Sequence, residues 1–168
     1  TTLEELRPLL ASAYADIAPT NNVAGAEYKS SSVPTSLVEL VETPVPSVAE
    51  LTAVLSARML ERRTEEIARG LCLVGPHRDD VTLTIGDLPT KGYASHGESW
   101  SMALALRLAS FALLRADGVE PVLILDDVFA ELDETRRDRL ADLVSGAEQV
   151  LITAAVAADV PAKLAGRR

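Results

Sequence analysis

The sequence predicts an α/β fold with a parallel sheet, preceded by a helix-rich region. Residues 121–125 and 149–153 are continuous apolar runs of strand length, and residues 134–144 between them have a helical pattern. Two fully apolar strands joined by a helix are typical of a parallel βαβ unit whose sheet is covered on both faces. The first 70 residues instead hold two amphipathic helical patterns, which indicates an α-rich arm before the α/β lobe.

The elements of the helix-rich region follow from spacing and from end signals. Apolar residues recur at helical spacing over residues 3–17, and the stretch 23–41 mixes β-forming residues with Ser and Gly, which fits one or two short strands. A second helix is expected over residues 47–69, because Ser47 can cap its beginning and Gly70 can close it. Its charged C-terminal half suits a projecting helix.

The α/β lobe from residue 71 onward alternates short apolar runs with helical stretches. Strands are expected at 71–74 and 81–85. A polar loop over residues 87–96 leads into a strongly apolar helix from about residue 98 to 115. The strand, helix and strand named above complete the lobe.

Length and composition place the chain among soluble globular proteins. Its 168 residues, 48% hydrophobic and 24% charged, suit one domain or a domain with an appendage. The net charge of −9 argues against coating nucleic acid with the whole surface, so any DNA contact must be local. The basic clusters are expected to be solvated helix faces; they are Arg62-Arg63, Arg136-Arg137 with Arg139, and Arg167-Arg168.

Compartment signals are few. No apolar run approaches the roughly 20 residues of a membrane span, so no membrane partner is expected. The single cysteine, Cys72, cannot form an intramolecular disulfide, and cytoplasmic location is therefore the expectation. The start at Thr1, without an initiator Met, is interpreted as a truncation.

Two carboxylates at the end of a buried strand are the sharpest chemical feature. The apolar run 122–125 ends directly in Asp126 and Asp127. Ligands bind at the C-terminal ends of parallel strands in open α/β sheets, and adjacent carboxylates there repel unless a cation compensates. A hard metal such as Mg²⁺ is the expected cation. The alternative is that the pair only begins a loop or caps the next helix.

A second feature is the start of the apolar helix. Ser95, Gly97 and Glu98 stand where unpaired backbone N–H groups and the positive end of the helix dipole can bind phosphate. Ser95 and Glu98 also fit a capping box, and in that case the pattern is only structural. The order of the two features along the chain favours the phosphate interpretation.

The motifs follow one another in the order found in the C-terminal lobe of ABC-type P-loop ATPases. That order is a helix start with small residues, a buried helix, a strand ending in Asp126-Asp127, and a second apolar strand. Together with the GPHRDD string, it resembles the RecF family of SMC-like ABC ATPases over residues 71–155. The string consists of Gly75, Pro76, His77, Arg78, Asp79 and Asp80. The resemblance implies that residues 71–168 form the C-terminal lobe of the ATPase head. Residues 1–70 would be part of a helical arm or second lobe.

The resemblance implies a role for each matching residue. Ser95, Gly97 and Glu98 match the signature segment, which touches the γ-phosphate of ATP held by the opposite subunit. Asp126 matches the Walker B carboxylate that holds Mg²⁺ through water, and Asp127 the carboxylate that polarises the attacking water. The D-loop, which crosses the dimer interface, is matched by Ala130, Glu131, Leu132 and Asp133.

Three departures from the family pattern imply a slow, switch-like ATPase. Glu98 replaces the signature glutamine and brings an anion near a polyphosphate. Asp127 is shorter than the Glu of many ABC ATPases, which increases the distance from the base to the water. Ala154 stands where the switch histidine is expected, and leaves Thr153 as a weak substitute.

The Walker A lobe is absent from this chain. No GxxxxGK[ST] string occurs, and none of Lys29, Lys91 and Lys163 lies in such a loop. Because that loop and its lysine hold the β- and γ-phosphates, the chain by itself is not expected to hydrolyse ATP.

For the intact protein, the resemblance implies a weak ATPase in recombinational repair, with ATP and Mg²⁺ as cofactors. Its partners would be single-stranded or gapped duplex DNA, a second copy held through ATP, and other recombination-mediator proteins. Two alternatives stay open: a non-catalytic interaction module, and another SMC-like ATPase. The GPHRDD segment is either a salt-bridged structural turn or a contact to nucleotide or DNA.

Overall fold

The computed structural model describes residues 2–18, 23–31, 47–164 and 166. The chain divides by packing into two compact units: unit 1 consists of Thr1–Gly25 with Leu83–Arg168, and unit 2 of Ala26–Thr82. This division differs from the boundary expected at residue 70. None of the helices in the described residues is long and apolar enough to cross a membrane.

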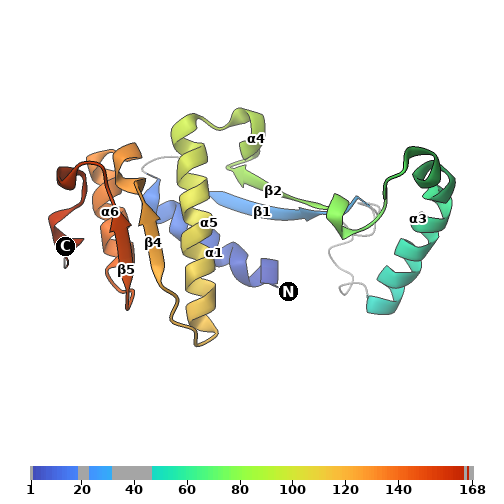
Figure 1. Cartoon of the computed structure of the whole chain (residues 1–168), viewed down its shortest axis with the longest axis horizontal. Helices are drawn as coiled ribbons and strands as arrows, with labels where there is room; N and C mark the ends of the chain where they lie inside the picture. Colours follow the sequence, from blue (N-terminus) through green and yellow to red (C-terminus); the bar gives the residue numbers. More distant parts are fainter. Residues whose placement is uncertain (1, 19–22, 32–46, 165, 167–168) are drawn as a thin grey trace. The chain divides into compact units, whose positions relative to one another are not determined.

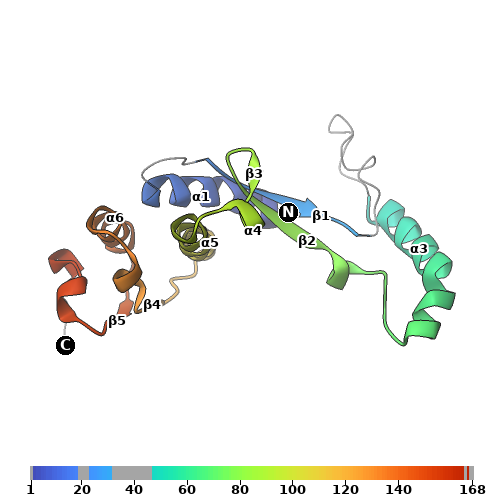
Figure 2. The same ribbon diagram turned by 90° about the horizontal axis from the view of Figure 1, so that it is seen from above.

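The core of unit 1 forms where two helices distant in sequence pack together. Helix α1 (Thr2–Ile17) lies against α5 (His96–Ala116), as Figures 1 and 2 show. Leu10, Tyr14 and Ile17 of α1 are fully buried. Both helices were predicted, and the burial of α1 on α5 explains why its apolar residues recur at helical spacing.

The predicted parallel βαβ unit is confirmed in unit 1. Strands β4 (Leu123–Asp126) and β5 (Val150–Thr153) pair in parallel and lie side by side in Figure 1. Helix α6 (Glu134–Val144) connects them along the chain. Their register runs from Leu123 opposite Val150 to Asp126 opposite Thr153. The C-terminal ends of the two strands therefore meet at one edge of the sheet.

The expectation that this sheet is covered on both faces is wrong for the described residues. Leu123 and Leu125 are buried, whereas Ile124 and Leu151 are 64% and 48% exposed. Because successive side chains of a strand point to opposite faces, one face packs into the core and the other stays open.

A second sheet contains β1 (Ala24–Lys29), β2 (Asp80–Ile85) and β3 (Leu88–Pro89) in that order. β2 and β3 are antiparallel around a turn in which Gly86 has φ 57°. The predicted polar loop 87–96 thus contains β3 and the short helix α4 (Thr90–Tyr93). The boundary between the two units falls within β1 and β2.

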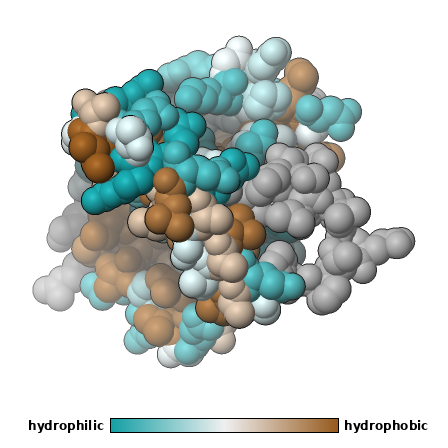
Figure 3. All heavy atoms as spheres, turned by 90° about the vertical axis from the view of Figure 1, so that its right-hand side faces the viewer, coloured by the Kyte–Doolittle hydropathy of each residue, from teal (hydrophilic) through white to brown (hydrophobic). Residues whose placement is uncertain are grey.

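Unit 2 is built around α3 (Val48–Arg69), which begins and ends as predicted. The Ser47 hydroxyl accepts from Glu50 N at 3.3 Å, Glu50 Oε2 accepts from Ser47 N at 2.8 Å, and Gly70 adopts a left-handed φ of 66°. Glu66 is the buried residue of this helix. In Figure 3, which looks onto the side that carries α3, hydrophilic side chains mix with hydrophobic ones on the near surface.

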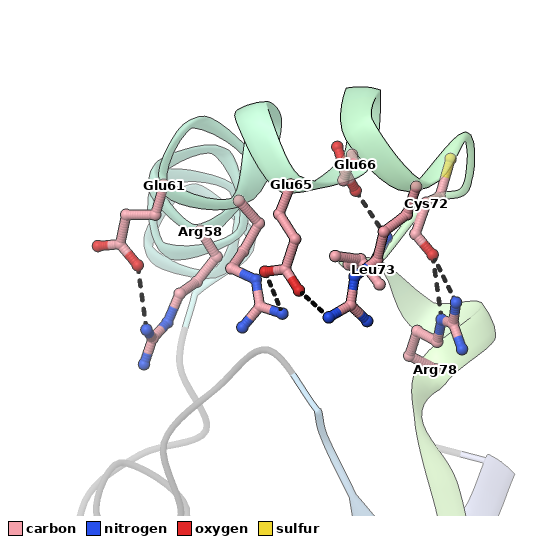
Figure 4. Close-up of polar contacts among 9 residues, drawn as sticks. Arg58, Glu61, Glu65, Glu66, Cys72, Leu73 and Arg78 are labelled. Atoms are coloured by element: carbon pink, nitrogen blue, oxygen red, sulfur yellow. Dashed lines mark hydrogen bonds and ion pairs between the residues drawn. The ribbon is translucent and has the colours of Figure 1, made fainter.

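The strand predicted at 71–74 is wrong. These residues form no strand, and Leu73 N donates instead to the Glu66 carboxylate at 2.7 Å (Figure 4). A side chain from α3 satisfies this backbone group, so it needs no neighbouring strand. The expected strand region 23–41 contains β1, and its part beyond residue 31 lies outside the described residues.

Candidate functional site

Asp126 and Thr153 meet at the edge where β4 and β5 end. The two residues are paired in register, and the Thr153 hydroxyl donates to Asp126 Oδ1. Asp127 N donates to Thr153 O at 3.2 Å, and the same nitrogen lies 3.1 Å from Thr153 Oγ1. Both Asp side chains are exposed. Thr153 therefore holds the carboxylate of Asp126 and the backbone of Asp127 in place, without covering either carboxylate.

The backbone of Asp127 is in a conformation that most residues avoid. Its φ of 53° is the only positive value among the described non-glycine residues. Asp tolerates this left-handed region better than bulkier residues, and such outliers concentrate at functional sites. Ala155 N lies 3.4 Å from Asp127 Oδ1. The end of β4 therefore turns sharply and presents two consecutive carboxylates to solvent.

The oxygen donors at this edge suit Mg²⁺. Asp126, Asp127 and Thr153 offer only oxygen atoms, which hard cations prefer. Among the described residues no group of three His, Cys, Asp or Glu side chains could form a complete protein cage. Mg²⁺ usually keeps several waters and binds one or two carboxylates together with substrate phosphates, so an open pair of carboxylates fits it.

The N-terminus of α5 carries the predicted capping box. Ser95 Oγ accepts from Glu98 N at 3.3 Å, and Glu98 Oε2 accepts from Ser95 N and from Ser95 Oγ, both at 2.8 Å. The Glu98 carboxylate therefore folds back onto the helix start. The expectation of a helix cap is confirmed, and a phosphate at this position would compete with Glu98 for the Ser95 hydroxyl.

Arg136 of α6 lies against the same helix start, which the sequence did not suggest. Its Nη1 atom is 3.2 Å from the point where a Cβ on residue 97 would lie, so Gly97 permits the close approach. Arg136 Nε is buried and lacks a hydrogen-bond partner within the described residues, with Asp133 Oδ2 at 3.5 Å. Burial raises the pKa of the Tyr14 hydroxyl and Glu98 raises it further, whereas Arg136 lowers it. A cation therefore accompanies the Glu98 anion at the start of α5.

The other arginines of α6 also differ from the expected solvated face. Arg137 pairs with Asp159 at 2.9 Å and donates to Leu132 O at 2.8 Å. Arg139 donates to Ala18 O at 3.4 Å. Only the fold could show the contacts to Asp159 and Ala18, because they join α6 to segments elsewhere in the chain. Arg167 and Arg168 lie outside the described residues.

The residues matched to the D-loop form the link between β4 and α6. A 3-10 turn spans Val128–Glu131 around the fully buried Phe129. Ala130 and Glu131 are exposed, whereas Leu132 is buried. Asp133 caps α6 by accepting from Arg136 N at 3.0 Å. Burial of Phe129 and Leu132 thus anchors the turn, whereas Ala130, Glu131 and Asp133 are exposed.

Within unit 1, the start of α5 and the ends of β4 and β5 lie toward the same end. In Figure 1 the beginning of α5 and the C-terminal ends of β4 and β5 all point to the upper end of the unit. Hydrogen bonds join Ser95 to Glu98 at the start of α5, and the two Asp residues to Thr153 and Ala155 at the ends of the strands.

The GPHRDD segment lies in unit 2 and forms a tight turn. Gly75 has φ 136°, which requires glycine, and a 3-10 turn follows over Pro76–Arg78. Arg78 Nε and Nη2 donate to Cys72 O at 3.1 and 2.8 Å (Figure 4). His77 Nε2 lies 3.4 Å from the same oxygen. Hydrogen bonds to a backbone carbonyl, rather than a salt bridge, hold this part of the turn.

Asp79 connects the turn to the end of β1. Its carboxylate accepts from the Tyr28 hydroxyl, from Ser30 Oγ at 3.3 Å, and from Ser31 N and Oγ at 2.6 and 3.0 Å. Partial burial acts to raise the pKa of Asp79, but the hydrogen bonds from Tyr28, Ser31 and Ser30 together hold it below its usual range. The same bond to Asp79 raises the pKa of Tyr28.

Asp79→Asn is expected to lower the free energy of unfolding by about 2 kcal/mol at neutral pH, because several hydrogen bonds to a charged acceptor are weakened. A folded-state pKa below the unfolded value stabilises the protein above the unfolded pKa, and this contribution is lost as pH falls through the folded pKa. Urea unfolding should therefore show a difference from the native protein at pH 7 that shrinks below about pH 4.

Asp80→Asn is the matched control, since the Asp80 carboxylate accepts from the neighbouring Val81 N at 2.8 Å. A difference for Asp79→Asn that stays constant across this pH range would contradict the stabilising role of its charge.

Two curated relatives align with nearly the whole chain. The DNA replication and repair protein RecF of Frankia alni is 58% identical over 166 residues, and that of Cutibacterium acnes is 56% identical over 175 residues. Each alignment covers 99% of this chain.

The chain belongs to the RecF family. It corresponds to the C-terminal region of these RecF proteins and spans 43% of the length of each. A scan against protein-family models finds none that matches.

Solved RecF structures have the same fold. The recombination mediator protein RecF-ATPrS of the RecFOR pathway superposes with a TM-score of 0.75 and 25% identity, over 95% of this chain and 40% of that one. RecF-ATP of the same pathway gives a TM-score of 0.74 over 93% of this chain and 39% of that one, also at 25% identity. The α/β fold expected for the RecF ATPase head is thus confirmed.

Proposed function

We propose that the full-length protein is an ATP-dependent DNA-binding protein of recombinational repair, in which ATP joins two copies of the ATPase head. The arrangement that carries the proposal is the edge of the β4–β5 sheet. Asp126 and Asp127 are exposed there, and Thr153 of the neighbouring strand binds the carboxylate of Asp126 and the backbone N–H of Asp127. The names of the RecF relatives and the nucleotide in the RecF-ATP structure support the same function.

Each carboxylate has a separate task in this proposal. Asp126 would hold Mg²⁺ through water, and the ion would supply positive charge for the phosphates of ATP. Asp127 accepts a proton from the attacking water, and its left-handed backbone places it at the turn that follows β4. Because an Asp is shorter than a Glu and Ala154 replaces the switch histidine, hydrolysis is slow.

The start of α5 serves the opposite subunit. Ser95 and the backbone N–H groups at Gly97 and Glu98 contact the γ-phosphate of ATP bound to the other copy. Arg136 offsets the negative charge of Glu98 near that phosphate, since its guanidinium lies over Gly97. The exposed residues Ala130 and Glu131 of the D-loop face the dimer partner.

The ATP-bound dimer clamps single-stranded or gapped duplex DNA and assists recombinase loading with other recombination-mediator proteins. Hydrolysis opens the dimer and releases the DNA. This chain holds no Walker A loop, so it supplies only the signature, Walker B and D-loop part of each ATP site.

The decisive experiment is light scattering on the full-length protein with and without ATP and Mg²⁺. A roughly twofold rise in mass that needs both is expected, because each ATP is held by residues of two subunits. Gapped DNA should then bind more tightly with ATP than without it. A mass that does not respond to ATP in a folded protein would refute the proposal.

An interaction module without catalysis is the second candidate. One observation favours it: the capping box of Ser95 and Glu98 matches that of Ser47 and Glu50 on α3, where no nucleotide role is expected. In that case ATP should change neither the mass nor the DNA affinity.

A further inference from the structure

A hollow in unit 2 is lined on several sides by arginine. Its volume is about 380 Å³, and its described lining residues are Ser31, Arg58, Arg62, Leu73, Val74 and Arg78. All three charged side chains in that lining are positive, although the whole chain has a net charge of −9. Such a concentration of guanidinium groups against an acidic background favours an anionic ligand.

Ion pairs along α3 orient Arg58 and Arg62 but leave some of their N–H donors for a ligand. Arg58 pairs with Glu61 at 3.0 Å and Arg62 with Glu65 at 2.7 Å, both along α3, as Figure 4 shows for Arg58 and Glu61. Each of these ion pairs uses one guanidinium nitrogen, whereas a guanidinium offers five N–H donors. Arg58 and Arg62 are one helical turn apart, so their Cβ atoms are about 5–6 Å apart on one face of α3.

The GPHRDD turn contributes another part of the lining, through Arg78. Two hydrogen bonds from Arg78 to Cys72 O fix the plane of its guanidinium, and Asp79 ties Ser31 to the same turn through Ser31 N and Oγ. Both Ser31 and Arg78 line the hollow. The turn therefore holds a wall of the hollow in a defined shape, which assigns this family motif a task.

The side chains that line the hollow favour one kind of anionic ligand over another, namely a nucleic-acid backbone over a mononucleotide. The described lining residues include no aromatic side chain that could stack on a base, and no amide or carboxylate that could read a base edge. Arginine contacts to phosphate oxygens carry no sequence information but position a protein on DNA. The lining therefore suits the backbone of a nucleic acid better than a mononucleotide.

We propose that this hollow is a contact site for the sugar-phosphate backbone of DNA, in which Arg58, Arg62 and Arg78 bind backbone phosphates. The inference rests on the DNA binding proposed above and names the residues responsible for part of it. It also agrees with the net charge, since DNA contact in an acidic chain must be local.

The test compares two charge-matched substitutions on α3. Arg62→Gln removes a charge from the hollow, and Arg63→Gln removes the same charge from the neighbouring exposed residue, which is outside the lining. Binding of fluorescently labelled gapped duplex DNA to the full-length protein with ATP is measured by anisotropy at several salt concentrations. A double substitution, Arg58→Gln with Arg62→Gln, extends the series.

The double variant should bind DNA at least about ten-fold more weakly. The slope of log affinity against log salt should decrease by about 1.8, which is about 0.9 for each phosphate that is no longer neutralised. Arg63→Gln should leave the slope unchanged. Binding of a fluorescent ATP analogue and ATP-dependent dimerisation should be unaffected in every variant, which separates backbone phosphate from nucleotide phosphate and shows that the variants fold.

Equal DNA affinities and slopes for the native protein and the double variant would overturn the inference and leave the proposed function standing. A loss of ATP analogue binding with DNA binding intact would overturn it in favour of a nucleotide site. If the native protein binds no DNA at all, the proposed function fails and this site fails with it.

Discussion

Asp127→Asn is expected to slow ATP hydrolysis by the full-length protein about 10²- to 10⁴-fold, the usual contribution of a general base. The amide cannot accept the proton of the attacking water. Asn tolerates the left-handed backbone that Asp127 adopts at φ 53°, and it keeps a side-chain oxygen for the contact to Ala155 N. The substitution therefore removes the base while it preserves the turn at the end of β4.

Phosphate release measures the rate, and light scattering measures the dimer. ATP-dependent dimerisation should persist and last longer, because hydrolysis no longer opens it. Asp117→Asn, the same change at the exposed C-terminal end of α5, is the control and should leave the rate unchanged. An undiminished rate in Asp127→Asn would remove Asp127 from the role of base.

Ser95→Arg is expected to abolish ATP-dependent dimerisation. The substitution removes the hydroxyl proposed to contact the γ-phosphate and places a long side chain at the start of α5, where the phosphate of the opposite subunit would approach. It also removes the cap of α5, which costs about 1 kcal/mol. The expected result is a protein that stays monomeric in light scattering at ATP concentrations that saturate the native protein.

The capping cost can be separated from the effect on dimerisation. Ser47 caps α3 with the same hydrogen-bond pattern, through Glu50, so Ser47→Arg loses a comparable cap without touching α5. Both variants should lose similar stability in urea unfolding, but only Ser95→Arg should lose the dimer. Dimerisation of Ser95→Arg at the native ATP concentration would argue for the interaction-module alternative.

The elements predicted correctly share a local origin. The helices α3 and α5 have their cap residues and apolar spacing within the segment itself, and β4 and β5 are uninterrupted apolar runs. The carboxylates at the end of β4 were recognisable because the apolar run stops at them. These features depend on neighbours in sequence, which is why patterns in the sequence suffice.

The errors concern features that need distant partners. Residues 71–74 have strand-like composition, but a strand needs a neighbour, and the Glu66 side chain binds Leu73 N instead. Ile124 and Leu151 are apolar and were expected to be covered, yet no described element packs on that face. The composition of a segment shows which of its side chains are apolar, but it does not show which other elements of the fold pack on them.

The sequence by itself determined the α/β class, the parallel strand pair, the helix caps and the order of motifs that places the chain in the RecF family. Only the tertiary structure decided that α1 packs on α5, that Arg136 lies over Gly97, and that Asp79 binds Tyr28 across 51 residues. The physical reason is that periodicity and capping act over a few residues. Side-chain partnerships between distant segments exist only once the chain has folded.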